Sequence, residues 1–178
     1  TQNGGGLSIQ RTTQESDSLG IVRRSTTPGN RTTHTVESHD SSGQRTVTIT
    51  RPDGSTISRK SFPDGRLRSI SGTATVPRRY EYGVEDHQAF RKEIRLGNNG
   101  EDLDWVQTFT DMAGRVSKVI RSHERGSPAV STYHYNAKGQ LIRTEDPDGL
   151  TFLFSYNSLG ERTVTAVDLN RNHVIDFS

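Results

Sequence analysis

The sequence predicts an all-β protein, built as an array of consecutive antiparallel β-hairpins that form a twisted or spiral sheet. Two segments, Tyr135–Gly139 and Tyr156–Gly160, read Tyr-Asn-x-x-Gly and lie one short period apart. Asn favours turns because its side chain bonds its own backbone, and Gly adopts the positive φ angles that tight turns need. A period of about 22 residues holds two strands and two turns, which is one hairpin.

Weaker copies of this turn recur upstream and bring the predicted number of hairpin units to seven, or about 14 short strands. Three copies keep Asp and Gly, one keeps only the Gly, and one is marked only by Tyr82. The predicted turn residues are Asp17, Gly20, Asp40, Gly43, Asp64, Gly65, Asp111, Gly114, Asn136, Gly139, Asn157 and Gly160. The predicted repeat aromatics are Tyr82, Phe109, Tyr133, Tyr135, Phe152, Phe154 and Tyr156.

The array is predicted to occupy residues 16–178, after a Gly-rich linker or frayed N-terminus at residues 1–15. The longest step between successive turns predicts an inserted loop near residues 97–104. The only Met is Met112 and no signal peptide is present, so we expect the chain to be a fragment of a longer repeat array.

Period-two alternation supports the individual strands. Residues 46–50 alternate Thr with Val47 and Ile49, which places these two apolar side chains on one face. Phe152, Phe154 and Tyr156 also share a face, and their strand is predicted to be the best packed. Residues 85–95 contain good helix formers and fit either a helix or a strand, and the phase of the repeat favours the strand.

Composition restricts the function. Only 28% of the residues are hydrophobic and the net charge is +2, with acidic and basic residues interleaved. Such a chain has no deep helix-packed core and no basic stripe for nucleic acid. The absence of Cys excludes disulfides, thiolate catalysis and Cys-rich zinc sites, and no apolar run is long enough to span a membrane.

Residues 133–149 resemble the YD repeat of Rhs proteins. The segment Tyr133–Leu141, followed by Asp146–Gly149, is similar to Tyr-x-Tyr-Asp-x-x-Gly-x-Leu and then Asp-x-x-Gly, with Asn136 where the family has Asp. Residues 63–67 and 111–116 resemble the same unit. In that family, strings of hairpins wind into a spiral sheet, and large arrays form hollow shells in bacterial toxin complexes and polymorphic toxins. Related arrays occur in animal teneurins.

The resemblance implies a non-catalytic structural segment of a large exported protein. This segment would form part of a wall or shell that carries or encloses other domains, such as a toxin. The implied location is extracellular or at the cell surface, and the implied partners are flanking repeats and domains of the parent protein. Self-association through unpaired edge strands is also expected, because an exposed edge invites another chain to add on.

The resemblance also raises one catalytic question. Asp146–Leu150 matches the Asp-Pro-x-Gly-Leu signature that ends many Rhs cores, where an aspartate-dependent self-cleavage releases a C-terminal toxin. Leu141 stands where the family has Pro, and the Gly-Gly and Asn-x-Tyr that usually follow are absent. Similar turns occur elsewhere in this chain, so the sequence favours a hairpin turn and no enzyme.

A weaker candidate for a metal site lies near the C-terminus. Asp168, Asn170, Asn172 and Asp176 occupy positions 1, 3, 5 and 9 of a calcium-loop pattern. His173 replaces the Gly of that pattern, and the twelfth position lies past Ser178. Asp168 also falls where the repeat expects its second turn. The sequence therefore predicts a turn, no metal, no cofactor and little effect of calcium on stability.

The alternative function is a cell-surface binding module for carbohydrate or a partner protein. Exposed aromatic side chains stack on sugars, although more often they are cross-strand packing partners. This reading predicts that Trp105, Tyr80 and Tyr82 line an open groove. The His residues are scattered without metal-ligand spacing, and the sequence contains neither a nucleophile elbow nor a Gly-rich phosphate loop.

Overall fold

The computed structural model describes residues 11–17, 20–27, 31–123 and 126–176. All regular secondary structure in these residues is β-strand, in one sheet of 14 strands that follow one another in chain order. No helix in the described residues is long and apolar enough to cross a membrane. The strands are β1 Arg11–Asp17, β2 Gly20–Thr27, β3 Arg31–His39, β4 Arg45–Thr50, β5 Thr56–Ser61, β6 Leu67–Ser71, β7 Arg78–Glu85, β8 Gln88–Leu96, β9 Asp102–Thr110, β10 Val116–Arg121, β11 Ala129–Tyr135, β12 Leu141–Glu145, β13 Thr151–Tyr156 and β14 Arg162–Val167.

The predicted fold class is confirmed, and the strand alternative for residues 85–95 is the correct one. Strands β7 and β8 are joined by Asp86 and His87, whose φ angles are 49° and 62°. Two consecutive positive φ angles match the right-handed twist of a hairpin. The sheet therefore continues through the segment that the sequence left open.

The chain is divided into two compact units. The first contains residues 1–80 and 95–102, and thus all of β1 to β6. In this unit, Val47 pairs with Arg59 and Ile49 with Ile57, so the predicted apolar face is confirmed. No described residue of β1 to β6 is fully buried, because both faces of this single layer of strands remain accessible to solvent.

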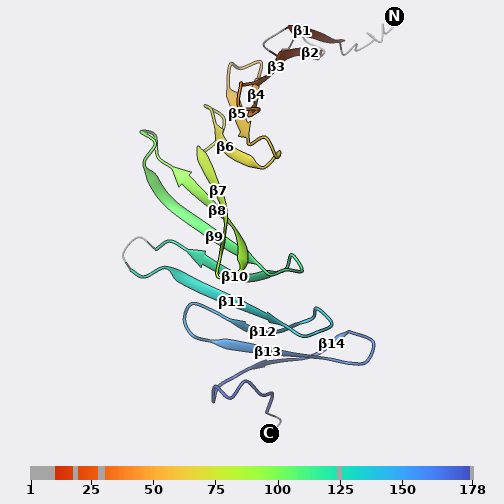
Figure 1. The fold of residues 1–178 in the computed structure, drawn as a ribbon, viewed down its shortest axis with the longest axis vertical. Coiled ribbons are helices and arrows are strands. Elements are labelled where there is room, and N and C mark those ends of the chain that lie inside the picture. The colour runs from red at the N-terminus through yellow and green to blue at the C-terminus, as the bar shows by residue number, and fades with distance from the viewer. Residues whose placement is uncertain (1–10, 18–19, 28–30, 124–125, 177–178) are drawn as a thin grey trace, which may run out of the picture. The chain divides into compact units, whose positions relative to one another are not determined.

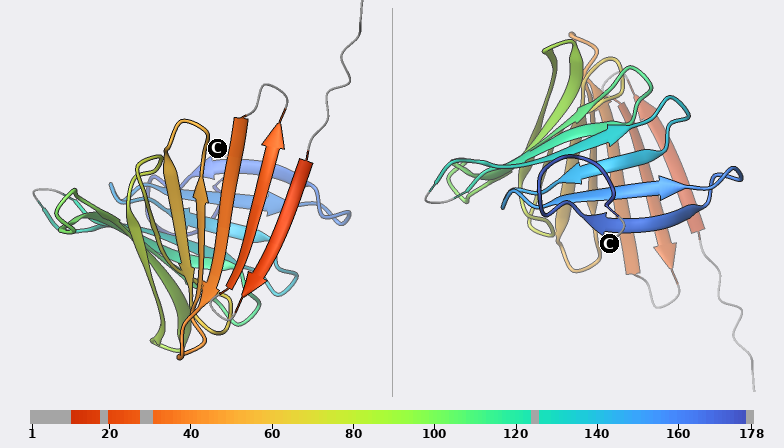
Figure 2. Two further views of the ribbon diagram at one scale, coloured as in Figure 1. Left: turned by 90° about the horizontal axis from the view of Figure 1, so that it is seen from above. Right: turned by 90° about the horizontal axis from the view of Figure 1, so that it is seen from below.

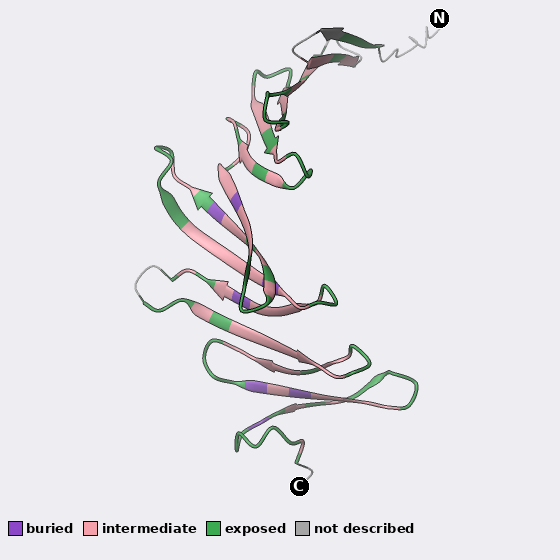
Figure 3. Cartoon of the chain, viewed as in Figure 1, coloured by how far each residue is buried: buried purple, intermediate pink, exposed green. Residues whose placement is uncertain are grey.

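The second unit contains residues 81–94 and 103–178 and has a small core. Strands β10 to β14 of this unit lie side by side in chain order (Figure 1, Figure 2). Its buried hydrophobic residues are Ile94, Phe109, Val119 and Leu153 (Figure 3). Phe109 has no exposed surface, its ring centroid lies 5.8 Å from that of Phe90, and Lys118 Nζ lies 4.1 Å from the ring.

Strand β13 has two buried residues and every other described strand has at most one, which supports the prediction that it is the best packed, but its covered face is not the aromatic one. Its buried residues are Thr151 and Leu153, whereas Phe152, Phe154 and Tyr156 are only partly buried. Alternation correctly separates the two faces, but it does not tell which face is the better covered one. Here the smaller side chains lie on the covered face.

Two predicted boundaries also need correction. Strand β1 begins at Arg11, so part of the predicted linker at residues 1–15 is strand; residues 1–10 lie outside the described residues. The predicted insertion at residues 97–104 is an ordinary turn, because Gly97 N donates to Glu101 O at 2.8 Å and β9 begins at Asp102. The long step arises instead from β8 and β9, which have 9 residues each.

Candidate functional site

The repeated turn is closed by its first side chain as well as by its backbone. At Asp111, the amide donates to Arg115 O at 2.9 Å, and Gly114 N donates to Asp111 O at 2.9 Å. Asp111 Oδ1 accepts the amides of Ala113 and Arg115, both at 2.9 Å. Gly114 has a φ of 77°, which a residue with a Cβ rarely adopts. The backbone and side chain of Asp111 thus take part in four hydrogen bonds that close the turn.

Asn serves this turn as well as Asp does. Asn136 Oδ1 accepts the amides of Lys138 and Gln140, both at 3.0 Å, and Asn157 Oδ1 does the same for Leu159 and Glu161. The extra amide donor of Asn136 bonds Gln140 Oε1 at 2.8 Å. Asn at position 136 therefore preserves the turn. Asp40 and Asp146 cap their turns in the same manner.

Residues of three predicted repeat units are placed differently. Phe62 takes the first position of its turn, and Asp64 instead accepts the amide of Arg66 at 2.9 Å. Asp17 and Gly20 are strand residues that pair with each other, and the residues between them lie outside the described residues. Tyr82 lies within β7 rather than at the end of a strand.

Two tyrosines tie their hairpins to the preceding ones. Tyr135 Oη donates to Val116 O, and Tyr156 Oη donates to Leu141 O, each at 2.8 Å. Each acceptor is the first residue of its strand, two residues after the turn Gly, where the strand register shifts. A register shift disrupts the ladder locally, and the hydroxyl bonds a carbonyl at that point. This bond gives a physical reason for Tyr rather than Phe in the repeat.

Changing Tyr135 or Tyr156 to Phe should lower the free energy of unfolding by about 0.5–1.5 kcal/mol each, because each change removes one hydrogen bond and leaves a partly buried carbonyl. Urea denaturation would measure the loss. Tyr133→Phe is the matched control, since the structure shows no hydrogen bond between the Tyr133 hydroxyl and a described residue. An equal loss in all three variants would contradict the proposed role of the hydroxyl.

The turn carboxylates should also make stability dependent on pH. The side chain of Arg115 and its amide hold the pKa of Asp111 below its ordinary value, and the Ser42 hydroxyl does the same for Asp40. A lowered pKa in the folded state stabilises the protein above the unfolded pKa of about 4, and this stabilisation is lost as the pH falls through the folded value.

We therefore expect the contribution of these carboxylates to the melting temperature to be nearly constant from about pH 7 to 5 and to be lost below about pH 4. Asp111→Asn should reduce this dependence while keeping the turn, because Asn136 shows that an amide oxygen accepts the same two backbone bonds. Thermal melts from neutral to acidic pH would measure both effects. A flat profile below pH 4 would show that the turn carboxylates do not contribute.

The segment considered for self-cleavage has the geometry of the other turns. Asp146 N donates to Leu150 O at 2.9 Å, and Asp146 Oδ1 accepts the amides of Asp148 and Leu150. Asp146 is the side chain that would act in self-cleavage, and its Oδ1 is already bonded to two backbone amides that close the turn. The structure supports the simpler interpretation of Asp146–Leu150 as a hairpin turn.

The C-terminal segment does not form the hairpin turn that the repeat predicts after β14. Asp168 N donates to Thr151 O instead, and the Asp168 side chain, which is fully buried, accepts the amides of Asn172 and His173 at 3.2 and 2.9 Å. Asp176 Oδ2 accepts the side-chain amides of Asn170 and Asn172 at 2.8 and 3.2 Å. The four predicted oxygen-bearing residues therefore converge on one loop.

The loop geometry leaves the prediction about calcium unchanged, because Asn170 and Asn172 turn their amide nitrogens, not their oxygens, toward Asp176 Oδ2. His173 has a φ of 60°, so it adopts the left-handed conformation that the missing Gly would supply. The loop has only two carboxylates, and no group of three or more His, Cys, Asp or Glu in the described part of the chain is placed to hold a metal. Amide oxygens of Asn170 and Asn172 would have to complete the ligand set, which is typical of weak calcium sites.

We accordingly expect about 10 mM calcium to raise the melting temperature by less than about 2 °C, and equal magnesium to do no more. Asp168→Asn and Asp176→Asn should leave this small response unchanged. A rise of several degrees in calcium that is lost in both variants would show that the loop binds the ion.

The aromatic groove predicted for carbohydrate is not formed by the expected residues. Tyr80 is buried in the first unit. In the second unit, Lys92 Nζ lies 4.2 Å from the centre of the Trp105 ring and covers one of its faces. Tyr82 is half-buried within β7. These rings act as packing partners more than as an open stacking surface.

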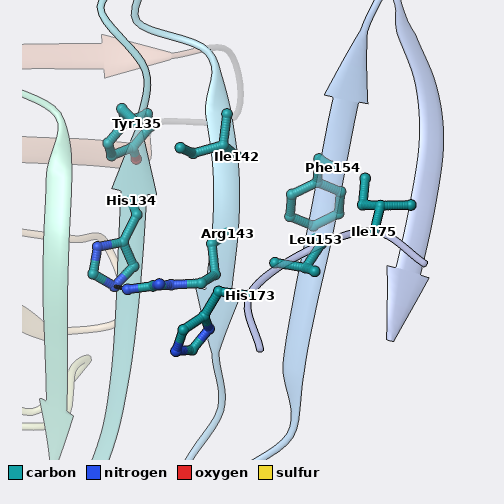
Figure 4. A pocket seen from close by; sticks show the side chains of 8 residues that line it. All are labelled: His134, Tyr135, Ile142, Arg143, Leu153, Phe154, His173 and Ile175. Atoms are coloured by element: carbon teal, nitrogen blue, oxygen red, sulfur yellow. Dashed lines mark hydrogen bonds between the residues drawn. The ribbon is translucent and has the colours of Figure 1, made fainter. Parts of the chain in front are cut away.

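A cavity that the sequence did not reveal lies on β11, β12 and β13 beside the C-terminal segment. Its volume is about 390 Å³. It is lined by His134, Tyr135, Ile142, Arg143, Leu153, Phe154, His173 and Ile175 (Figure 4). His134 and Arg143 meet there because they are register partners on adjacent strands, a relation that the sequence alone does not specify.

The polar groups of this cavity are coupled. Arg143 Nη2 lies 3.0 Å from His134 Nε2, and because a guanidinium only donates, this nitrogen of His134 accepts. Burial, followed by the nearby Arg143 charge, lowers the pKa of His134. Arg143 Nε lies 3.1 Å from Glu145 Oε1. The cavity thus presents a neutral imidazole beside a paired guanidinium, which suits binding of a small polar ligand more than acid–base catalysis.

Comparison with known proteins identifies one family. Residues 135–170 match the model of the RHS repeat, which covers both Tyr-Asn-x-x-Gly turns and the bond from Tyr156 to Leu141. No curated protein matches the chain. The RHS repeat is a structural repeat, and the turns at Asp40 and Asp111 have the same capped geometry as the turns within the matched segment. The match over residues 135–170 supports assignment of this segment to the Rhs/YD-repeat family.

Proposed function

We propose that this chain is a non-catalytic wall segment of a large exported Rhs/YD-repeat protein. The wall would carry or enclose other domains, such as a toxin, outside the cell or at its surface. The observation that carries this proposal is the bond from one hairpin to the next through Tyr135 and Tyr156. Such bonds stabilise a sheet that grows by hairpin addition and do not by themselves form a reactive site.

The distribution of polar side chains supports the same proposal. The acidic and amide side chains of the repeat, including Asp111, Asn136 and Asp146, cap backbone amides in the turns. None of the residues of β1 to β6 whose burial the structure describes is fully buried, which suits a thin wall rather than a compact enzyme domain. Interior space in such proteins would be created by the sheet as a whole.

Limited proteolysis of the full-length gene product would test the proposal. An enclosed domain should resist protease until the wall is weakened, so Phe109→Ala should accelerate cleavage of that domain, whereas Leu159→Ala at an exposed turn should not. Fractionation of the culture should recover the product outside the cytoplasm. A domain that is cleaved equally fast with and without the repeat segment would refute the enclosing role.

The second candidate is a binding module for carbohydrate or a partner protein, and the cavity beside His134 and Arg143 favours it. Small-ligand sites usually combine apolar walls with a few converging polar groups, and this cavity combines Ile142 and Leu153 with His134 and Arg143. A glycan array probed with the intact chain would test this function. Binding that is lost in Arg143→Ala and kept in Arg162→Ala would support the cavity, and an array without any signal would reject the carbohydrate reading.

A further inference from the structure

We infer that the cavity on β11, β12 and β13 is a binding site for a small organic acid, with the carboxylate of the acid on the guanidinium of Arg143 and its apolar body against Leu153 and Ile175 (Figure 4). This inference goes beyond both candidate functions, because the ligand is neither a carbohydrate nor a partner protein and the site does not depend on the wall.

The polar and apolar parts of the cavity come from one row of side chains across three strands. Arg143 on β12 pairs with His134 on β11 and with Leu153 on β13. Directly opposed residues of antiparallel strands lie on the same face of the sheet. The Arg143 side chain extends toward His134 and away from Leu153 (Figure 4). Strands β11 and β12 therefore form a polar end of the cavity, and β13 forms an apolar end.

The C-terminal segment has the same division along its length. His173 lies at the polar end of the cavity and Ile175 at the apolar end (Figure 4). This segment is held in place by Asp168, whose amide donates to Thr151 O at 2.9 Å and whose side chain accepts the amide of His173 at 2.9 Å. A second set of side chains thus borders the cavity, and its polar and apolar members match those of the strands.

Arg143 has hydrogen-bond donors that no described residue uses. A guanidinium carries five N–H groups. Nη2 donates to His134 Nε2 at 3.0 Å, and the buried Nε lies 3.1 Å from Glu145 Oε1. No described residue accepts a hydrogen bond from Nη1, and the side chain is 24% exposed. The described residues that line the cavity include no Asp or Glu, so the acceptor for Nη1 has to come from a ligand or from water.

This arrangement favours a carboxylate over other charged groups. A carboxylate presents two acceptor oxygens that match the planar guanidinium. An amine would place a second cation beside Arg143, and a phosphate would bring up to two negative charges to a guanidinium whose charge Glu145 already offsets. The volume of about 390 Å³ lies within the range of small-ligand sites, and Leu153 and Ile175 can cover an apolar body.

An NMR titration of the intact chain with hexanoate tests the inference. The resonances of the Arg143 side chain and of Ile175 should shift together and saturate, with a dissociation constant of about 0.1–10 mM. Hexanamide, which has a similar shape without the charge, should bind about 5–30-fold more weakly. Acetate should bind more weakly by at least about tenfold, because each buried methylene strengthens binding up to about fourfold. Hexylamine should cause no saturable shift.

Two variants test the two ends of the cavity separately. Arg143→Gln should weaken hexanoate binding to about the level of hexanamide, and Arg121→Gln is the matched control, because Arg121 is exposed on β10 and does not line the cavity. The control should change the affinity less than about twofold. Ile175→Ala should weaken the binding of hexanoate about 3–10-fold and that of acetate less than about twofold. An unchanged melting temperature would show that each variant is folded.

Three results would each overturn the inference: equal affinities for hexanoate and hexanamide, a preference for hexylamine, or no saturable shift up to about 50 mM hexanoate. The comparison of these ligands uses the unaltered chain, so it decides the matter even if Arg143→Gln fails to fold. None of these results would touch the proposed functions. The wall function depends on protection of an enclosed domain, and the carbohydrate reading depends on the signal from the glycan array.

Discussion

Replacing Phe109 with alanine should lower the free energy of unfolding by about 3–5 kcal/mol, the largest loss expected from any single truncation in this chain. Phe109 has no exposed surface, and only four other hydrophobic residues are buried among those described. Its ring contacts Phe90, and Lys118 Nζ lies over it at 4.1 Å. Because the core is so small, few neighbours can move to fill the space that the ring leaves.

Urea denaturation with equal m-values would measure this loss, and Leu159→Ala is its control. Leu159 is 82% exposed at the tip of a turn, so its truncation should change the free energy by less than about 0.5 kcal/mol. Ile94→Ala, at 1% exposure, should fall between the two variants. A loss below about 1 kcal/mol for Phe109→Ala would mean that the sheet does not depend on its small core.

The fold could be predicted because its determinants are local. Turns such as Asn136–Gly139 specify their own hydrogen bonds within five residues, and alternation in β4 correctly placed Val47 and Ile49 together. The turn at Asp86 and His87 carries no Gly, which explains why the sequence left residues 85–95 open. The spacing between successive turn motifs also did not distinguish an inserted loop near residue 97 from two long strands, β8 and β9.

The candidate site was less predictable because it depends on register. His134 and Arg143 meet only when β11 and β12 pair as observed, with a register shift after His134. The hydrogen bonds of Tyr135 and Tyr156 join two different hairpins. The repeated motif therefore predicts the tyrosines but not the carbonyls that accept their hydroxyls. In the C-terminal loop, the pattern from Asp168 to Asp176 was visible in the sequence, whereas the left-handed backbone of His173 was not. The register pair, the tyrosine bonds and the conformation of the C-terminal loop all depend on tertiary structure, which turn motifs and strand alternation do not specify.

Replacing Gly139 with valine should cost about 1–3 kcal/mol through backbone strain. Gly139 and Gly160 both have the predicted positive φ, at 82° and 86°. A Cβ on Gly139 would meet only Arg115 Nη1, at 3.3 Å, and that flexible side chain can move. The cost should therefore follow the backbone preference of the new residue, so that Asn, which tolerates this conformation, costs less than Ala, and Ala less than Val.

Gly126→Val separates strain from the general effect of a larger side chain. Gly126 is exposed, its φ lies outside the left-handed range, and a Cβ there would meet only His123 Nδ1 at 3.5 Å. Its replacement should change the melting temperature by less than about 2 °C. If Gly139→Asn and Gly139→Val destabilised the protein equally, steric contact rather than φ would limit this turn. The same positive φ recurs at Gly43, Gly65, Gly114 and Gly160. The order in which Asn, Ala and Val at position 139 destabilise the protein therefore tests whether backbone conformation explains the Gly of the whole repeat.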